Sequence, residues 1–354
     1  MRILQVITDT DRRGAQLFAL DLAVALTELG HSVRTVALAP GVVGGLDVEV
    51  IGPRRRSVRG TWALRRRMAR FDVTIAHGSS TGPACALAGA GEGRPFVYRQ
   101  VSDSRFWAPD PIRRARVRRS LARADRVVTL SAFNRRDLVD WIGVPGERIR
   151  IIPNGVAATR FPPVDDATRH ATRVALGLPE APTLVSVGAF VAEKGNDLVI
   201  AALADLPGVH LLLAGDGPER VKLQQQAARV APGRVHFVGV LDQAVIAFRA
   251  ADVAVLASRG GDAMPASMIE AGLCGLPAVS TAVGAIPEIV LDGRTGAIVD
   301  PDDRRALTAA LRRMTDDLDG AAAMGRAARE HCLANFEITP VARAWSDVLA
   351  DVVG

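Results

Sequence analysis

The stretch that decides the fold is residues 183–214, TLVSVGAFVAEKGNDLVIAALADLPGVHLLLA. Two short apolar runs, Thr183–Val187 and His210–Ala214, enclose a segment that enters a helix after Gly195. Continuous apolar strands joined by helical crossovers are typical of parallel sheets that are covered on both faces. This stretch therefore predicts one strand–helix–strand unit of an α/β fold.

The same alternation extends over the rest of the chain. Further strands are predicted at Arg2–Ile7, Val33–Leu38, Val48–Ile51, Val73–His77, Phe96–Val101, Arg126–Leu130, Arg150–Ile152, Val235–Val238, Val253–Leu256, Ala278–Ser280 and Ala297–Val299. Helices are predicted at Ala15–Leu29, Arg304–Met314, Ala321–Ala334 and Pro340–Val352. The predicted apolar face of the first helix comprises Leu17, Leu20, Ala23, Val24 and Leu26.

Residues 153–166, PNGVAATRFPPVDD, interrupt this alternation. They contain three prolines and no periodicity, which is typical of a linker. A length of 354 residues also favours two domains. We therefore expect one doubly wound domain over residues 1–163, a second from residue 164 onward, and a cleft between them. Ligands of such sheets lie beyond the carboxyl ends of the strands, so the functional residues are expected in those loops.

Positive charge is concentrated in the first domain. Residues 1–163 hold 27 basic and 14 acidic residues, and residues 164–354 hold 17 and 24, so net charges of +13 and −7 give +6 overall. The densest stretch, Arg54–Arg70, combines eight arginines with Val58, Trp62, Leu64 and Met68. It fits a surface helix on anionic lipid, or an ordinary solvated helix face. With only 4% aromatic residues to stack on bases, we expect no nucleic-acid partner.

Cysteine usage and hydropathy predict the compartment. Cys85, Cys274 and Cys332 lie far apart, which excludes a disulfide framework and favours a reducing environment. The N-terminal MRILQVITDTDRRG reads as a strand rather than a signal peptide, and no apolar stretch approaches the roughly 20 residues that span a bilayer. We expect a cytoplasmic protein that contacts the inner face of a membrane, if at all, through Arg54–Arg70.

Two loops carry candidate phosphate contacts. The loop Thr8–Gly14 lacks both G-x-G-x-x-G and G-x-x-x-x-G-K, so Gly14 is either a tight turn or a place where backbone approaches a phosphate. Lys194 lies between a strand end and a helix start, where its charge would meet a phosphate. The alternative for Lys194 is a solvated surface lysine.

A third loop, Ser258–Glu270, reads SRGGDAMPASMIE. Pro265 suits the first turn of a helix, and Asp262 precedes that helix. Glu270 follows Asp262 by eight positions and lies in the largely apolar run Ala266–Cys274. A buried carboxylate needs a partner, either in the protein or on a ligand.

Taken in order, these pieces resemble the family-4 retaining glycosyltransferases of GT-B architecture over essentially the whole chain. The motifs that carry the resemblance are GAQLFALDLAVALTELGHSV, ADRVVTLSAFNRRDL, IRIIPNGV, EKGNDLVIAAL, LLLAGDGPE, FVGVL and DAMPASMIEAGLCGLPAVSTAVGAIPEIV. The resemblance implies two Rossmann-like α/β domains facing a cleft. Residues 1–163 would hold the acceptor, residues 164–338 the nucleotide sugar, and a C-terminal helix of residues 339–354 would return to the first domain.

The resemblance also implies roles for individual residues. Lys194 would neutralise the leaving diphosphate, Asp262 and His77 would face the transferred sugar, and Glu270 would bind the donor ribose. The remaining donor contacts would come from backbone or small side chains: Gly14, Gly239, Leu241, Met264, Pro265, Ala266 and Ser267. Two positions depart from the family pattern, because Asp262 replaces a glutamate and Ala189 replaces an arginine. Arg259 or an arginine of the first domain could compensate for Ala189.

We therefore expect a retaining, metal-independent transfer of a sugar from a nucleotide-diphosphate sugar to an acceptor hydroxyl, with no cofactor. The resemblance favours a UDP-sugar, with GDP as the other candidate. The acceptor stays open among a small molecule, a glycan and a lipid. Two alternatives remain: a non-catalytic GT-B protein that binds nucleotide or a partner enzyme, and a nucleotide-sugar epimerase or hydrolase.

Overall fold

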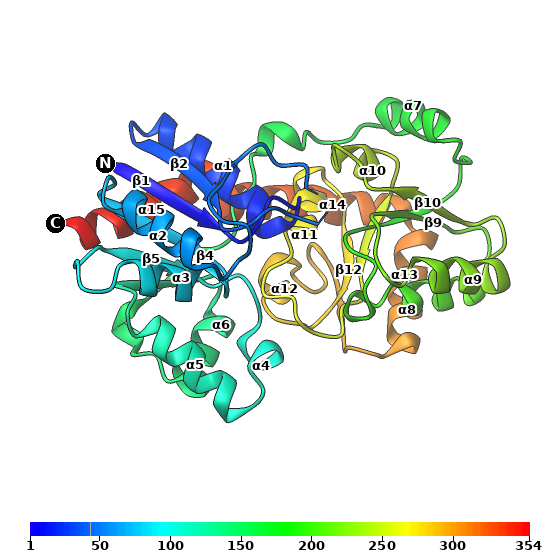
Figure 1. Ribbon diagram of the computed structural model, residues 1–354. Coiled ribbons are helices and arrows are strands. Elements are labelled where there is room, and N and C mark those ends of the chain that lie inside the picture. Colours follow the sequence, from blue (N-terminus) through cyan, green and yellow to red (C-terminus); the bar gives the residue numbers. More distant parts are fainter. Residues whose placement is uncertain (43) are drawn as a thin grey trace. The chain divides into compact units, whose positions relative to one another are not determined.

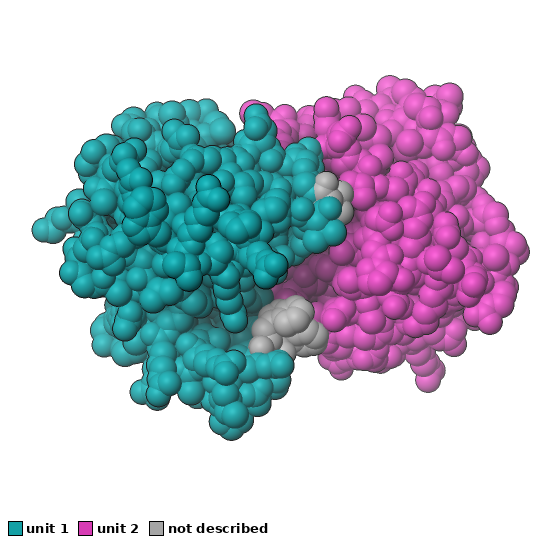
Figure 2. Space-filling model, in the orientation of Figure 1, with its two compact units in different colours: residues 1–157, 336–354 teal, residues 158–335 magenta. Residues whose placement is uncertain are grey.

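The computed structural model of the protein describes residues 1–42 and 44–354. The chain forms two compact units, one of Met1–Ala157 with Phe336–Gly354 and the other of Ala158–Asn335 (Figure 2). The chain passes from the first unit to the second at residue 158, inside the stretch predicted as a linker. Each of the thirteen predicted strands is present within two residues of its predicted ends.

The first unit is built on a parallel sheet with strand order β3-β2-β1-β4-β5-β6-β7. Its strands are β1 (Arg2–Ile7), β2 (Ser32–Ala37), β3 (Glu49–Val50), β4 (Val73–His77), β5 (Phe96–Arg99), β6 (Arg126–Thr129) and β7 (Ile149–Ile151). Ile3 pairs with Val33 of β2 and Val73 of β4, so β1 lies inside the sheet between these two strands. The sheet is therefore doubly wound, as expected.

Helices cover both faces of this sheet (Figure 1). On one face, α1 (Gly14–Glu28) and α15 (Ile338–Val353) pack on the buried strand residues Ile3, Val73 and Ile75. On the other face lie α2 (Val58–Met68), α3 (Thr81–Ala88) and α5 (Pro111–Leu121), and the short α6 (Ala132–Asp137) contacts β7. The predicted return of the C-terminal helix to the first unit is confirmed, because Trp345 and Leu349 of α15 are fully buried in its core.

The sequence prediction about the packing face of the first helix is wrong. In α1 the buried residues include Phe18, Leu22 and Leu26, whereas Val24 is 61% exposed. This helix is apolar almost all round, so its periodicity does not single out the face that packs. In the Arg54–Arg70 stretch, Leu64 and Met68 are buried against the sheet because α2 needs an apolar face, which leaves Val58 and Trp62 exposed.

The second unit repeats the design with strand order β10-β9-β8-β11-β12-β13, all parallel. Its strands are β8 (Thr183–Val187), β9 (His210–Ala214), β10 (Val235–Gly239), β11 (Val253–Leu256), β12 (Ala278–Thr281) and β13 (Gly296–Val299). Its helices are α7 (Asp166–Leu176), α8 (Asn196–Ala202), α9 (Arg220–Val230), α10 (Val245–Arg249), α11 (Ala266–Leu273), α12 (Ile286–Ile289), α13 (Arg304–Asp316) and α14 (Leu318–Phe336). The expected α/β fold class is confirmed in both units.

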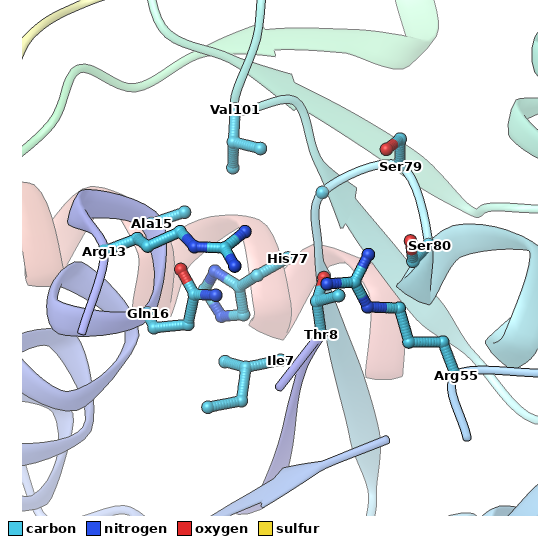
Figure 3. A pocket seen from close by; sticks show the side chains of 11 residues that line it. Ile7, Thr8, Arg13, Ala15, Gln16, Arg55, His77, Ser79, Ser80 and Val101 are labelled. Atoms are coloured by element: carbon cyan, nitrogen blue, oxygen red, sulfur yellow. The ribbon is translucent and has the colours of Figure 1, made fainter. Parts of the chain in front are cut away.

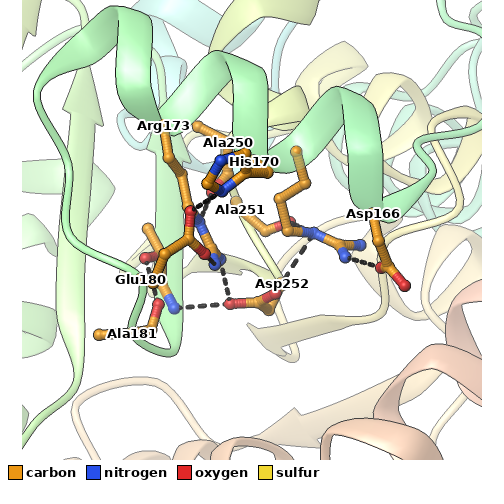
Figure 4. Close-up of polar contacts among 10 residues, drawn as sticks. Asp166, His170, Arg173, Glu180, Ala181, Ala250, Ala251 and Asp252 are labelled. Atoms are coloured by element: carbon orange, nitrogen blue, oxygen red, sulfur yellow. Dashed lines mark hydrogen bonds and ion pairs between the residues drawn. The ribbon is translucent and has the colours of Figure 1, made fainter.

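Charged side chains anchor α7 to the starts of the two central strands of this sheet (Figure 4). Asp252 accepts hydrogen bonds from the buried Arg173 at 2.6 Å and from the backbone N–H of Thr183 at 2.8 Å. Arg173 also donates to Glu180 at 3.1 Å and to the carbonyl of Ala250 at 2.9 Å. These contacts fix the helix that follows the linker onto the starts of β8 and β11.

Across the part of the chain that the structure describes, none of the helices combines the length and the apolar character needed to cross a bilayer. The cysteines Cys85, Cys274 and Cys332 are all free and buried. Burial raises the pKa of the Cys274 thiol to about 12, with the neighbouring Glu270 charge adding to the effect. The three thiols are therefore packing residues rather than nucleophiles.

Candidate functional site

Both sheets change the direction in which strands are added at one point, which is where ligands of doubly wound folds bind. In the first sheet this switch lies between β1 and β4, beyond Ile7 and His77. In the second sheet it lies between β8 and β11, beyond Val187 and Leu256. Most candidate residues of the sequence lie at or just beyond these strand ends, and the exceptions are Gly239 and Leu241 at β10 and Glu270 within α11.

In the second unit, the structure brings Lys194 and Asp262 together. The Lys194 Nζ donates to Asp262 Oδ1 at 2.6 Å, and the side chains are 22% and 14% exposed. The hydroxyl of Ser258 donates to the other oxygen, Asp262 Oδ2. The lysine thus lies at the switch point with one of its three N–H donors used, and is not the isolated surface lysine of the alternative interpretation.

Two glycines make this pairing possible. Gly195 has a φ of +65°, and a Cβ there would lie 1.9 Å from the carbonyl oxygen of Ala257. Gly284 has a φ of +56°, and its Cβ would lie 1.9 Å from the carbonyl oxygen of Asp262. Close backbone approach therefore packs the Lys194 turn against the end of β11 and supports the Asp262 loop from behind.

Arg259 braces the same turn. Its Nη1 and Nη2 donate to the two oxygens of Asp197 at 2.7 and 2.8 Å, and its Nε donates to Asp302 at 2.6 Å. Nη1 also reaches the carbonyl of Ala192 at 2.8 Å. The hydrogen bond to Asp197 raises the pKa of Arg259. These bonds engage all three nitrogens of the guanidinium and hold it against the Lys194 turn, and compensation for Ala189 by Arg259 stays a prediction.

The remaining donor-side candidates lie around the start of α11 and the end of β10. Met264 and Pro265 are buried, and α11 begins at Ala266 with no side chain capping it. Glu270 is half buried in the second turn of α11, four residues beyond Ala266. The remaining two candidates, Gly239 and Leu241, lie at the end of the edge strand β10 and just beyond it.

In the first unit, a pocket of about 230 Å³ opens at the switch point (Figure 3). His77 and Gly78 at the end of β4 line it, together with Thr8 beyond β1. The side chains of Arg13 and Arg55 extend into it from different loops. Its position beyond strand ends and its polar lining make it the candidate site of this unit.

His77 is enclosed by hydrogen bonds within the unit. Its Nε2 lies 2.6 Å from Gln5 Oε1, and its Nδ1 lies 3.4 Å from Nη1 of the buried Arg99. Because Arg99 is a donor only, Nδ1 must accept and Nε2 must carry the proton. Burial, followed by the charge of Arg99, holds the pKa of His77 well below its ordinary value of 6.5. His77 is thus a neutral imidazole of one tautomer.

Arg99 is itself an unusual buried charge. It is 1% exposed, donates to Asn154 Oδ1, and lies over the ring of Phe18 at 3.8 Å from the ring centroid. Burial lowers the pKa of Arg99 to about 9, so it stays protonated at neutral pH. Its contacts identify it as the side chain that positions His77.

Gly14 is the first residue of α1 and is exposed. A Cβ there would meet no atom within 4 Å, and its φ is not positive. The tight-turn interpretation of Gly14 is therefore wrong, because nothing within the unit requires a glycine at this position.

Several of the residues that shape these sites gave no usable sequence signal. Arg55 is one of eight arginines in its stretch, and Ser258 is an ordinary loop serine. Arg99 did carry a signal, because it is a charge inside the apolar run Phe96–Val101. Among residues 1–42 and 44–354, no group of three or more histidine, cysteine or acidic side chains is arranged to hold a metal ion.

Two family models match the chain, one described as glycosyltransferase family 4 over residues 12–160 and one as glycosyl transferases group 1 over residues 181–317. The GDP-mannose-dependent alpha-(1-6)-phosphatidylinositol monomannoside mannosyltransferase of Mycolicibacterium smegmatis is 34% identical over 77% of this chain and 75% of its own length. The D-inositol 3-phosphate glycosyltransferase of the same species is 30% identical over 93% and 80%.

Solved structures share the fold. Anabaena HepE in complex with UDP and glucose superposes with a TM-score of 0.89, at 21% identity over 99% of both chains. The sucrose-phosphate synthase of Thermosynechococcus elongatus superposes with a TM-score of 0.87, at 23% identity over 99% of this chain and 98% of that one.

Proposed function

The chain belongs to the family 4 glycosyltransferases and is a sugar-transferring enzyme of GT-B fold, and we propose that it transfers the sugar of a nucleotide-diphosphate donor with retention and without a metal ion. The observation that carries the proposal is the Lys194–Asp262 pair at the switch point of the second sheet. In this proposal Asp262 holds the lysine where the leaving diphosphate develops its charge.

The Lys194–Asp262 pair keeps hydrogen-bond donors and acceptors that a bound donor sugar nucleotide could use. A lysine ammonium has three N–H donors, and the contact with Asp262 uses one of them. Each oxygen of Asp262 accepts one described bond, from Lys194 or from Ser258, and has room for a sugar hydroxyl. Stabilisation of a developing charge by preorganised donors is commonly the largest contribution to catalysis. The uncapped start of α11, at Ala266 and Ser267, would add backbone N–H donors to the same phosphates.

In the first unit we assign the neutral His77 to the transferred sugar and Gly14 to the phosphates of the donor. Both ring nitrogens of His77 are engaged by Gln5 and Arg99, so the histidine orients the sugar by shape and through its backbone and is no general base. The acceptor hydroxyl then attacks on the face that the diphosphate leaves. An oxygen of that leaving group takes the proton as the new glycosidic bond forms and the old bond breaks.

The base of the donor follows from two opposing indications. Family resemblance favours uridine diphosphate, whereas the relative that is 34% identical is GDP-mannose-dependent. We propose a UDP-sugar, with a GDP-sugar as the competing candidate. Glu270 would bind the ribose in either case, and the segment of Gly239 and Leu241 would lie beside the base.

We test the donor site by thermal unfolding with UDP, GDP, ADP and dTDP, using the wild type, Lys194→Ala and Lys222→Ala. Lys222 is the chain's other lysine, 73% exposed on α9 and paired with Glu219, which makes it a matched control. A ligand at a hundred times its Kd adds about 2.7 kcal/mol to the free energy of unfolding. We expect one nucleotide to raise the Tm of the wild type and of Lys222→Ala, and to raise that of Lys194→Ala less.

An absence of any shift at millimolar nucleotide would contradict the proposed donor site. Retention is tested separately, by the anomeric configuration of the product in NMR spectra. Turnover of the donor without any acceptor would favour the epimerase or hydrolase alternative.

We also propose that α2 contacts an anionic surface. Val58 is 89% and Trp62 is 58% exposed, and the guanidinium of Arg66 lies 4.7 Å from the Trp62 ring centroid. An exposed aromatic ring among arginines is the composition of a helix at a membrane interface. The opposite side of α2 is anchored in the unit by Leu64 and Met68.

A further inference from the structure

The pocket of the first unit has a lining that favours an anion. Two guanidinium groups reach it, from Arg13 at the start of α1 and from Arg55 in the loop after β3. Figure 3 shows them extending into the pocket from opposite sides. The residues that line the pocket include no carboxylate. A ligand group between the two guanidiniums would therefore meet N–H donors from both sides, although Asp9 and Asp11 pair with the two arginines outside the lining.

Two carboxylates lie behind the arginines and hold them. Asp9 is 1% exposed and accepts from Arg55 Nη2 at 2.6 Å and from Gln16 Nε2 at 2.9 Å. Asp11 accepts from Arg13 Nη2 at 2.5 Å. Among the described residues, Arg55 makes this one side-chain hydrogen bond, although a guanidinium has five N–H donors. The carboxylates thus fix the arginines and leave most of their donors for a ligand.

Hydroxyl groups complete the lining. Thr8, Ser79 and Ser80 all border the pocket, and Ser80 precedes α3 without capping it by a side-chain hydrogen bond. A carboxylate is planar and offers two oxygens, whereas a phosphate monoester offers three oxygens in a tetrahedral arrangement. Donors that approach from several directions therefore suit a phosphate better than a carboxylate.

The size of the pocket limits its ligand. Its volume of about 230 Å³ is below the roughly 300–1,000 Å³ of pockets that enclose drug-sized ligands. It fits a small headgroup better than several residues of a glycan. His77, which the proposed function places beside the transferred sugar, lines the same pocket.

We infer that this pocket binds the acceptor through a phosphate group, which Arg13 and Arg55 recognise. The acceptor is then a small hydroxylated molecule that carries a phosphate, either free in solution or as the headgroup of a lipid. The inference rests on the proposed function for the identity of the reaction. The phosphate preference rests on the pocket alone.

The test compares matched pairs of probes that differ only in the phosphate. Glucose 6-phosphate against glucose, and myo-inositol phosphate against myo-inositol, are titrated calorimetrically into the full-length wild type, Arg55→Met, Arg13→Met and Arg116→Met. Arg116 is an exposed arginine of α5 outside the pocket and serves as the control. We expect at least one phosphorylated probe to bind at least tenfold more tightly than its partner. That preference should disappear in both pocket variants and persist in Arg116→Met.

Equal binding of phosphorylated and plain probes, or an unchanged preference in Arg55→Met and Arg13→Met, would overturn the inference. A lipid source is tested with vesicles that contain phosphatidylinositol. Binding to them that is lost in Arg55→Met assigns the phosphate to a headgroup, and binding of the soluble probes alone assigns it to a free metabolite. Either result supports the inference.

The donor diphosphate is the other possible source of phosphate, and the nucleotide titration separates it. If Arg55→Met weakens nucleotide binding and leaves the polyol phosphates unaffected, the pocket belongs to the donor and the inference falls. If Lys194→Ala weakens nucleotide binding while the pocket variants change nothing, the proposed function stands and only the acceptor inference fails.

Discussion

At the scale of single residues, His77 shows how a histidine can serve a site without titrating. Gln5 and Arg99 fix its tautomer. The ring centroids of Phe18 and of Trp345 each lie 6.4 Å from the centroid of the imidazole ring. Burial and the Arg99 charge hold its pKa well below 6.5. The folded protein therefore keeps His77 neutral at a pH where the unfolded chain protonates it.

This difference in pKa predicts a pH dependence of stability. Between the lowered pKa of folded His77 and about 6.5, the unfolded state binds more protons, so stability is lost as the pH falls through this window. One proton corresponds to about 1.4 kcal/mol per pH unit. We expect His77→Asn to have a shallower slope of unfolding free energy against pH than the wild type, in urea titrations between pH 7.5 and 5.5. Equal slopes in the two proteins would show that His77 takes up its proton in the folded state.

Single residues also mark the limit of what the sequence predicted. Lys194 and Asp262 were found because each lies at a strand end beside glycines, yet their 2.6 Å contact joins residues 68 positions apart and needs the fold. Arg13 and Arg55 were not identified from the sequence, for a different reason. In a chain with 42 arginines, composition cannot separate a pocket arginine from a solvated one.

At the scale of elements, the Lys194 turn depends on backbone contact more than on side chains. Gly195 lets the turn touch Ala257, and Arg259 ties Ala192 and Asp197 on either side of the lysine. The position of Lys194 is therefore determined by β11 as well as by its own loop.

We predict that Gly195→Ala lowers transferase activity much more than a substitution with the same backbone strain elsewhere in the unit. Its Cβ would lie 1.9 Å from the Ala257 carbonyl oxygen, so the turn must shift and carry Lys194 away from Asp262. Gly208→Ala is the matched control, because Gly208 also has a positive φ, +76°, but open space around it. Both variants bear the left-handed strain of about 1–2 kcal/mol, seen as a lower Tm.

Only Gly195→Ala should also lose kcat/KM and the nucleotide-induced Tm shift. Equal kinetic losses in both variants would mean that the contact with Ala257 does not position the lysine.

The sequence predicted the positions of the strands better than it predicted side-chain contacts or helix faces. The predicted ends of the strands agree with the observed ends within two residues, because each strand is a short apolar run bounded by polar or glycine-containing loops. The face of α1 was predicted wrongly because the orientation of this helix is set by the sheet and α15, on which it packs. Periodicity describes one helix, whereas burial depends on two elements at once.

At the scale of the whole molecule, the charge asymmetry is the dominant feature. Residues 1–163 carry a net charge of +13 and residues 164–354 carry −7. The exposed Val58, Trp62 and Arg66 of α2 lie in the basic part. Such a charge distribution would orient the first unit toward an anionic surface.

We predict that the protein sediments with vesicles containing anionic phospholipid and that binding weakens as salt rises, because screening reduces surface attraction. Trp62→Ser and Arg66→Ser should each reduce the bound fraction. Arg220→Ser, on α9 of the second unit, should leave it unchanged. Binding that is insensitive to salt and to both α2 variants would show that α2 remains solvated.

The place of α15 has a consequence for how the protein is made. Trp345 and Leu349 of this helix complete the core that β1 and α1 begin. A ribosome makes residues 338–353 only after every residue of the second unit. The core of the nascent first unit therefore lacks the side chains of α15 while the second unit is being synthesised. The second unit is one unbroken segment and has no such delay. The order of completion during translation is therefore the reverse of the order of synthesis.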